Sequence, residues 1–192
     1  GSDAMSTSAR PDSRLTYDDF LLFPDDGQRH ELIGGEHYVT PSPTLRHQKL
    51  SGRLYLAIAD YLRAHSGVGE VYYAPLDVKL SNWDIVEPDL LLVTADQPEI
   101  LTEKHIAGAP ALVVEILSPG TRTRDQRLKR QLFEQSGVRE YWMVDPDLDT
   151  VTVDRLDDTG IFANREVLGA DAVLSTPLLP GWSFTLTQLF AR

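Results

Sequence analysis

The sequence predicts a mixed α/β protein in which helices cover a mixed central sheet. Two long segments carry apolar residues at helical spacing, and four shorter segments read as strands. Along the chain these segments follow the order helix, three strands, helix, strand. The predicted strands at positions 85–93 and 111–117 are almost continuously apolar, which is typical of strands covered on both faces. We therefore expect helices on the faces of the sheet.

Length and composition predict one folded domain. The chain has 192 residues, of which 42% are apolar, and it contains no cysteine. A disulfide framework and a thiolate metal site are thus excluded, and we expect a cytoplasmic protein. The longest apolar run has six residues, whereas about 20 are needed to cross a bilayer. We assign positions 1–15 to a tag remnant and mobile tail, and positions 16–192 to the domain.

The first elements are predicted from turn and cap residues. Positions 16–24 read as a short helix that ends at a proline, and positions 31–39 read as a hairpin whose turn contains Gly34 and Gly35. The first long helix lies within positions 41–67. The chain offers Ser42 or Thr44 as its cap and Gly67 as its end.

Strands dominate the next part of the predicted order. Positions 69–80 and 85–93 read as two strands joined by the turn SNWD, and the third strand is 111–117. A helix at 122–137 then ends at a glycine. The remaining predicted elements are a buried strand at 140–145, a hairpin through 150–156 and 162–168, and a short helix at 184–191.

Charge is unevenly distributed along the sequence. The chain has 18 basic and 29 acidic residues, a net charge of −11, which argues against a general nucleic-acid binder. Positions 121–132 nevertheless hold five basic residues and one acidic residue. At 100° per residue, Asp125 and Lys129 fall within the apolar stripe of this predicted helix. Arg127 and Arg130 fall on the opposite face, where they could meet phosphates.

Two lone acids in the predicted core strands are the main candidates for function. Glu115 is the one ionisable residue of ALVVEIL, and Asp89 precedes four apolar residues of the strand before it. A buried carboxylate needs a partner, and two that converge should repel unless a cation separates them. Oxygen ligands without cysteine suit Mg²⁺ or Mn²⁺, beside which Lys129 would add a positive charge.

Other interpretations of these residues stay open at this point. Glu115 could form a buried ion pair with an arginine or lysine and bind no metal. Asp89 after a proline could be a turn former, and Lys129 with Asp125 could be an internal salt bridge. His47 shares a helical face with apolar residues, so its ring points inward. There it could take part in the site, or it could only hydrogen-bond to a backbone carbonyl.

The segments HELIGGE, PSPTLRHQ, VEPDLLLV and VVEILSPGTRTRDQRLKRQLFEQSGVREYWMVDP resemble the Uma family of predicted restriction endonucleases, a branch of the PD-(D/E)XK nuclease superfamily. The resemblance implies a restriction-endonuclease-like core of αβββαβ order with added hairpins. It also implies metal ligands at Asp89 and Glu115. The superfamily places a lysine at the position of Leu117, but the Uma family carries it in the next helix, where Lys129 stands here.

Two further residues match recurrent family positions. These residues are His47 and Glu31. Glu31 could orient the metal site, or it could only hold its hairpin together. The resemblance implies a Mg²⁺-dependent (or Mn²⁺-dependent) endonuclease that acts on nucleic acid, DNA above RNA, as a homodimer. The alternative is a catalytically inactive nuclease-like module that binds nucleic acid or protein, which the acidic net charge favours.

Overall fold

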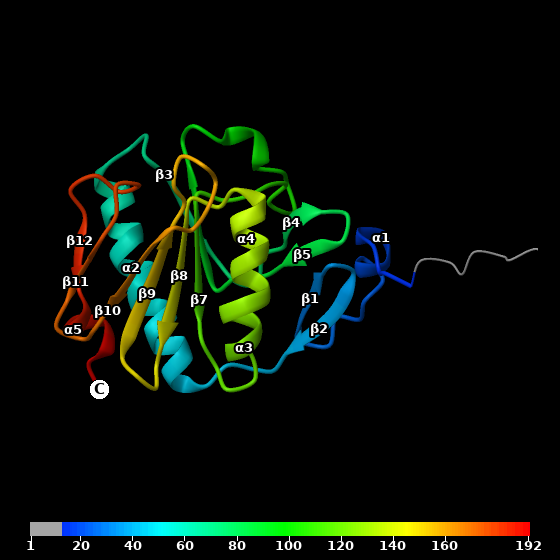
Figure 1. Cartoon of the computed structure of the whole chain (residues 1–192), viewed down its shortest axis with the longest axis horizontal. Helices are drawn as coiled ribbons and strands as arrows, with labels where there is room; N and C mark the ends of the chain where they lie inside the picture. Colours follow the sequence, from blue (N-terminus) through cyan, green and yellow to red (C-terminus); the bar gives the residue numbers. More distant parts are fainter. Residues whose placement is uncertain (1–12) are drawn as a thin grey trace, which may run out of the picture.

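The computed structural model describes residues 13–192, and its centre is a six-stranded sheet with the order β10-β9-β8-β7-β6-β3 (Figure 1). The pairing of β7 with β8 is parallel and the other pairings are antiparallel, so the sheet is mixed as predicted. Its strands are β3 (Gly69–Tyr73), β6 (Leu90–Thr94), β7 (Leu112–Ile116), β8 (Glu140–Asp145), β9 (Thr150–Arg155) and β10 (Asn164–Leu168).

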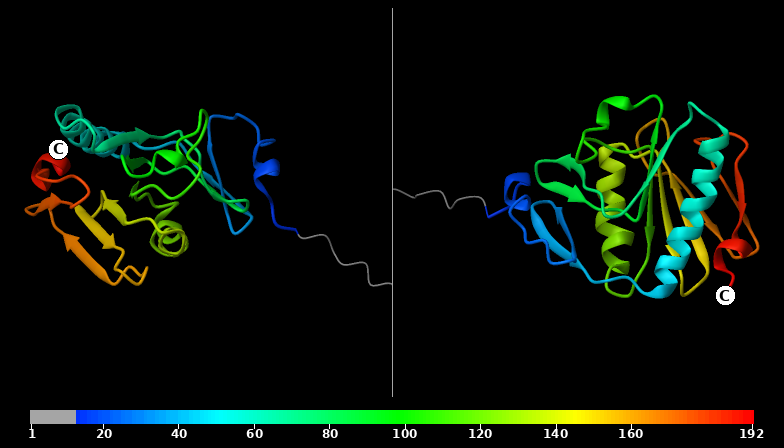
Figure 2. Two further views of the ribbon diagram at one scale, coloured as in Figure 1. Left: turned by 90° about the horizontal axis from the view of Figure 1, so that it is seen from above. Right: turned by 180° about the vertical axis from the view of Figure 1, so that it is seen from behind.

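Helices cover both faces of the central strands, which explains why those strands are apolar throughout. Helix α2 (Leu45–Ala64) lies on one face, and the helix from Arg122 to Ser136 lies on the other (Figures 1 and 2). Side chains of β7 alternate between the two resulting cores, with Val114 on the α2 side and Val113 on the other. By the same alternation, Glu115 points to the side of the second helix.

A second sheet was not predicted. Its order is β2-β1-β5-β4, and it joins two hairpins. The predicted strand 69–80 divides into β3 and β4, and the predicted strand 85–93 divides into β5 and β6. Pro75 and Pro88 lie in the two breaks, where a residue without an N–H interrupts a ladder. The strands of this sheet are β1 (Arg29–Ile33), β2 (Glu36–Thr40), β4 (Val78–Ser81) and β5 (Asp84–Val86).

The first hairpin and the first long helix have the predicted turn and cap residues. Gly34 and Gly35 join β1 to β2 with φ of 60° and 78°, which glycine adopts without strain. At the start of α2, Thr44 accepts a hydrogen bond from the backbone N–H of His47, so Thr44 is the cap. The helix ends at Ala64, earlier than the predicted stop at Gly67.

The second helix is continuous but not uniform. It consists of α3 (Arg122–Arg124), a π-helical segment η2 (Asp125–Lys129) and α4 (Arg130–Ser136). Gly137 ends it with φ of 87°, as predicted. The wider π turn buries Asp125 and Lys129 and leaves Leu128 39% exposed, although a regular wheel places Leu128 in the apolar stripe.

The remaining elements lie at the two ends of the molecule. Near the second sheet lie α1 (Tyr17–Phe20) and the backbone N–H of Leu15, which donates to Gly35. The far end contains β11 (Val173–Ser175), β12 (Ser183–Thr185) and α5 (Leu186–Phe190), and η1 (Pro98–Ile100) follows β6. Positions 1–12 of the predicted tail lie outside the described residues. Within residues 13–192, no helix is long and apolar enough to cross a membrane.

Candidate active site

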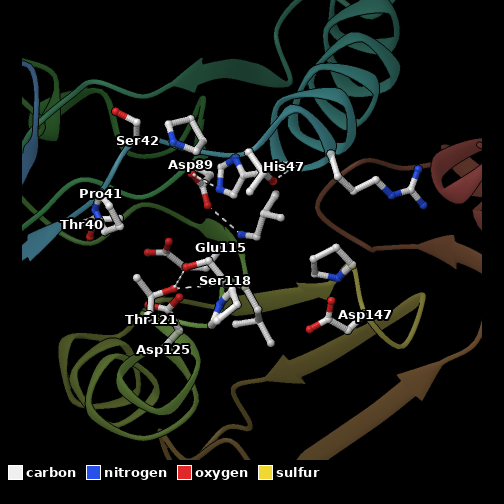
Figure 3. A pocket seen from close by; sticks show the side chains of 18 of the residues that line it. Thr40, Pro41, Ser42, His47, Asp89, Glu115, Ser118, Thr121, Asp125 and Asp147 are labelled. Carbon is white, nitrogen blue, oxygen red and sulfur yellow. Dashed lines mark hydrogen bonds and ion pairs between the residues drawn. The ribbon is translucent and has the colours of Figure 1, made fainter.

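Neighbouring strands bring the two predicted acids together. The antiparallel register of β6 and β7 pairs Leu90 with Val114, so the next residues along, Asp89 and Glu115, stand opposite each other. Their exposed fractions are 3% and 2%. Both nevertheless line a cavity of about 370 Å³, and Figure 3 shows them between helix α2 and Asp125. The cavity gives a solute access to the acids.

Lys129 is the ion-pair partner of Glu115. Its Nζ lies 2.8 Å from Oε1 of Glu115 and 2.9 Å from Oε2 of Glu31, and all three side chains are buried. A third carboxylate, Asp125, has Oδ1 at 3.5 Å from the same nitrogen. The inward direction predicted for Asp125 and Lys129 is confirmed. Glu31 does more than hold its hairpin, because it connects β1 to the charged cluster.

Asp89 is held by three donors. Nη2 of Arg29 lies 2.9 Å and Nε2 of His47 lies 3.2 Å from Oδ1 of Asp89, and the backbone N–H of Ile116 donates to Oδ2 at 2.7 Å. His47 thus contacts a carboxylate, and the alternative of a backbone carbonyl partner is wrong. Burial raises the pKa of Asp89, but the hydrogen bond from His47 and the charge of Arg29 bring the net pKa below its ordinary value.

The site holds more carboxyl groups than cations. Among the described residues at this end of the sheet, Glu31, Asp89, Glu115 and Asp125 face the cations Arg29 and Lys129. Full ionisation would leave two excess negative charges. Burial raises the pKa of Glu115 well above its usual value, and the neighbouring carboxylates add to this against the opposing charge of Lys129. A bound divalent cation would cancel the excess.

The donor set fits a hard divalent cation. Within this site, two buried oxygens lack a hydrogen-bond partner, Oε1 of Glu31 and Oδ1 of Asp125, and so does the buried nitrogen Nδ1 of His47. Oxygen atoms are the ligands that Mg²⁺ and Mn²⁺ take. Among residues 13–192, no three acidic or histidine side chains converge into a ready-made metal cage. The ammonium of Lys129 instead lies between the carboxylates of Glu31 and Glu115. The site thus offers the oxygen atoms that Mg²⁺ or Mn²⁺ would bind, with a lysine among them.

In the helix from Arg122 to Ser136, one arginine is less exposed than predicted. Arg127 is exposed, as predicted. Arg130 is only partly exposed, because its Nε lies 2.9 Å from Oδ2 of the fully buried Asp154. Arg130 therefore holds the helix to β9, and the prediction that it points freely to solvent is wrong. A regular wheel does not show this, because the partner lies on a distant strand.

Arg29 is the site residue that sequence reasoning missed. It starts β1 two residues before Glu31, so the two side chains emerge on the same face of the strand. Its guanidinium connects Asp89 to the backbone oxygen of Glu87, 3.1 Å away. The sequence signal was an arginine two residues before Glu31, just outside the predicted hairpin 31–39, whose first strand begins at Arg29 in the structure.

A mixed sheet between two helices, with two acids on adjacent strands and a buried lysine on the following helix, defines a nuclease-like α/β protein. The chain belongs to the Uma2 family, described as "Putative restriction endonuclease", whose model matches residues 17–187. A solved structure with a similar fold is titled as a "putative nuclease belonging to DUF820" from Anabaena variabilis. It is 22% identical with a TM-score of 0.77, over 92% of this chain and 98% of that one. The comparison with curated proteins gave no match.

Proposed function

We propose that this protein is a metal-dependent endonuclease that hydrolyses phosphodiester bonds of nucleic acid with Mg²⁺ or Mn²⁺. The observation that carries the proposal is the convergence of Asp89, Glu115 and Lys129 on the wall of one open cavity. Membership of a family described as restriction endonucleases supports the reaction class. A likeness of fold adds less, because one fold can serve many functions.

Each residue has a distinct role in the proposed reaction. Asp89 and Glu115 would hold the cation, which when bound polarises the phosphoryl oxygen and lowers the pKa of water. The ammonium of Lys129 stabilises negative charge that develops on the phosphoryl group and orients the attacking water. The water oxygen loses a proton to solvent and forms the new bond to phosphorus as the bond to the leaving nucleoside oxygen breaks, and that oxygen takes up a proton from solvent.

Glu31 and His47 act through these groups as positioning residues. Oε2 of Glu31 accepts hydrogen bonds from both Lys129 and the backbone N–H of Glu87, which fixes the ammonium. His47 contacts Asp89 and orients its carboxylate. Such supporting contacts typically affect metal affinity or activity by about 10- to 100-fold when removed.

A metal-dependent cleavage panel on single-stranded, duplex and branched DNA and RNA tests the proposal. The wild-type chain should cleave at least one substrate with Mn²⁺ and none with a chelator. Glu115→Gln should abolish cleavage, and the exposed control Glu103→Gln should leave it unchanged. Cleavage that persists at the wild-type rate in Glu115→Gln would assign the activity to another site.

The second candidate is a nuclease-like module without cleavage activity. The buried ion pairs favour it, because Lys129 and Arg29 already compensate part of the charge that a cation would bind. The discriminating measurement is the melting temperature of the wild-type chain with and without Mn²⁺. A ligand at 100 times its Kd stabilises the native state by about 2.7 kcal/mol, so a metalloenzyme should melt higher and an inactive module should not.

We also propose a homodimer, by analogy with nucleases of this size that carry one site per subunit. Light scattering at micromolar concentration measures this directly. A mass of twice 21.4 kDa is expected, and a mass of 21.4 kDa would contradict the proposal.

A further inference from the structure

A second cavity, of about 330 Å³, adjoins the proposed active site on the side of helix α2. Arg29, His47 and Asp89 line both cavities, so the second begins where the acidic site ends. Its other walls come from the first half of α2 and the end of β3. The residues that line this cavity and not the acidic one include Gln48, Ser51, Gly52, Tyr55 and Tyr73.

Two tyrosines give this cavity an aromatic wall. The rings of Tyr55 and Tyr73 meet edge to face, with centroids 5.0 Å apart and an angle of 80° between planes. Tyr73 ends the edge strand β3 and is 61% exposed, so much of its surface is available to a further planar group. Aromatic side chains of this kind are the platforms on which unpaired bases stack.

Other parts of the cavity wall are polar, so they can form hydrogen bonds with the edge of a base. The carboxamide of Gln48 can donate and accept hydrogen bonds, and the hydroxyl of Ser51 can do the same. Gly52 lines the same cavity, and an added Cβ there would meet no atom within 4 Å. The cavity therefore combines ring surface, hydrogen-bonding groups and open space beside the acidic site, with which it shares Arg29, His47 and Asp89.

We propose that this cavity is a subsite for one unstacked nucleobase of the strand being cleaved, next to the scissile phosphate. This inference rests on the proposed function, because it needs a phosphodiester at Asp89 and Glu115. A base inside a duplex is stacked on both sides and cannot enter a walled cavity unless it is extruded. The substrate class is accordingly nucleic acid with an unpaired nucleotide, single strands above intact duplex.

The test uses single-stranded oligonucleotides that carry the fluorescent base 2-aminopurine at successive positions, with a chelator present to prevent cleavage. Stacking on tyrosine should quench the fluorescence when the probe lies in the subsite. Tyr73→Ala should remove the quenching and weaken binding by about 5- to 150-fold, which corresponds to the loss of about 1 to 3 kcal/mol of base–aromatic stacking. Gly52→Leu should do the same by filling the cavity.

Matched variants separate the subsite from damage to the fold. Gly52→Leu replaces a poor helix former with a good one inside α2, so the helix should remain intact, as circular dichroism can verify. Tyr73→Phe keeps the ring and should retain quenching. Ala64→Leu adds the same leucine at an exposed position of the same helix, outside the cavity, and should bind as the wild type does.

Two outcomes would overturn the subsite. One is equal quenching and affinity in the wild type, Tyr73→Ala and Gly52→Leu. The other is a wild-type preference for intact duplex over single strands of the same sequence. Failure of the proposed function is a different result: the wild type would quench the probe through Tyr73 and yet cleave no substrate with Mn²⁺.

Discussion

Lys129→Met should destabilise the protein strongly, because it removes the cation that three buried carboxyl groups share. The lysine is 2% exposed and its ammonium lies within 3.5 Å of Glu31, Glu115 and Asp125. Removing one partner of a buried ion pair costs about 3 to 5 kcal/mol, since the remaining charge loses its compensation. In a domain of this size, each kcal/mol lowers Tm by about 2 to 4 °C. The expected loss is therefore about 6 to 20 °C.

Thermal unfolding followed by circular dichroism at neutral pH measures this loss. The control is Lys49→Met, which makes the same substitution at an exposed position of α2 and should change stability by less than about 0.5 kcal/mol. The double variant Lys129→Met with Glu115→Gln should recover part of the stability, because it removes one of the unpaired carboxylates. Mn²⁺ should also raise the Tm of Lys129→Met if the acids bind a cation.

A loss of less than about 1 kcal/mol in Lys129→Met would refute the charge argument, because a buried lysine that can be removed so cheaply does not compensate its neighbours. A double variant less stable than Lys129→Met alone would refute it as well. In that case Glu115 would stabilise the fold through contacts other than its ion pair.

Four further predictions follow from the same structure. Glu115→Gln should abolish the heat of Mn²⁺ binding in calorimetry while near-ultraviolet circular dichroism stays native. The hydrogen bond from Arg122 lowers the pKa of Asp145, so the stability lost in Asp145→Asn should be fully present at neutral pH, decline as the pH falls below about 3.8, and vanish only below the lowered pKa. Arg127→Ala should weaken nucleic-acid binding and reduce its salt slope by about one, as titrations at several salt concentrations would show. Arg130→Ala should instead lower Tm, because this arginine pairs with a buried acid of β9.

The parts of the site that could be predicted from the sequence depend on regular periodicity. Strands joined in sequence are commonly neighbours in a sheet, so Asp89 and Glu115 could be expected side by side. A helical wheel placed Lys129 on the buried face, and the π-helical segment did not change that direction. These three residues lie on elements whose faces are decided by local apolar pattern.

The rest depends on distant contacts that no local pattern encodes. Arg29 and Glu31 reach the site because their hairpin pairs with β5, a strand that was read as part of a longer one. The break at Pro88 separates β5 in the second sheet from β6 in the first, yet apolar runs lie beyond Glu87 and Asp89 on both sides of it, so the segment reads as one strand. The charge partner of Arg130 likewise lies on a strand 24 residues away. Such pairings are fixed by the tertiary fold.

The division of the site between two sheets has a consequence for how the protein unfolds. Arg29 and Glu31 belong to the four-stranded sheet, whereas Asp89 and Glu115 belong to the end of the six-stranded one. If the smaller sheet opened on its own, Asp89 would lose the guanidinium of Arg29 and Lys129 would lose the carboxylate of Glu31, while Asp89 and Lys129 stayed largely shielded from water. Local opening is thereby penalised, and the two sheets should behave as one cooperative unit in hydrogen exchange. The charged groups proposed for hydrolysis thus also hold the two hairpins of the smaller sheet against the core. Replacing the sequence of one sheet would therefore require changes in the other sheet.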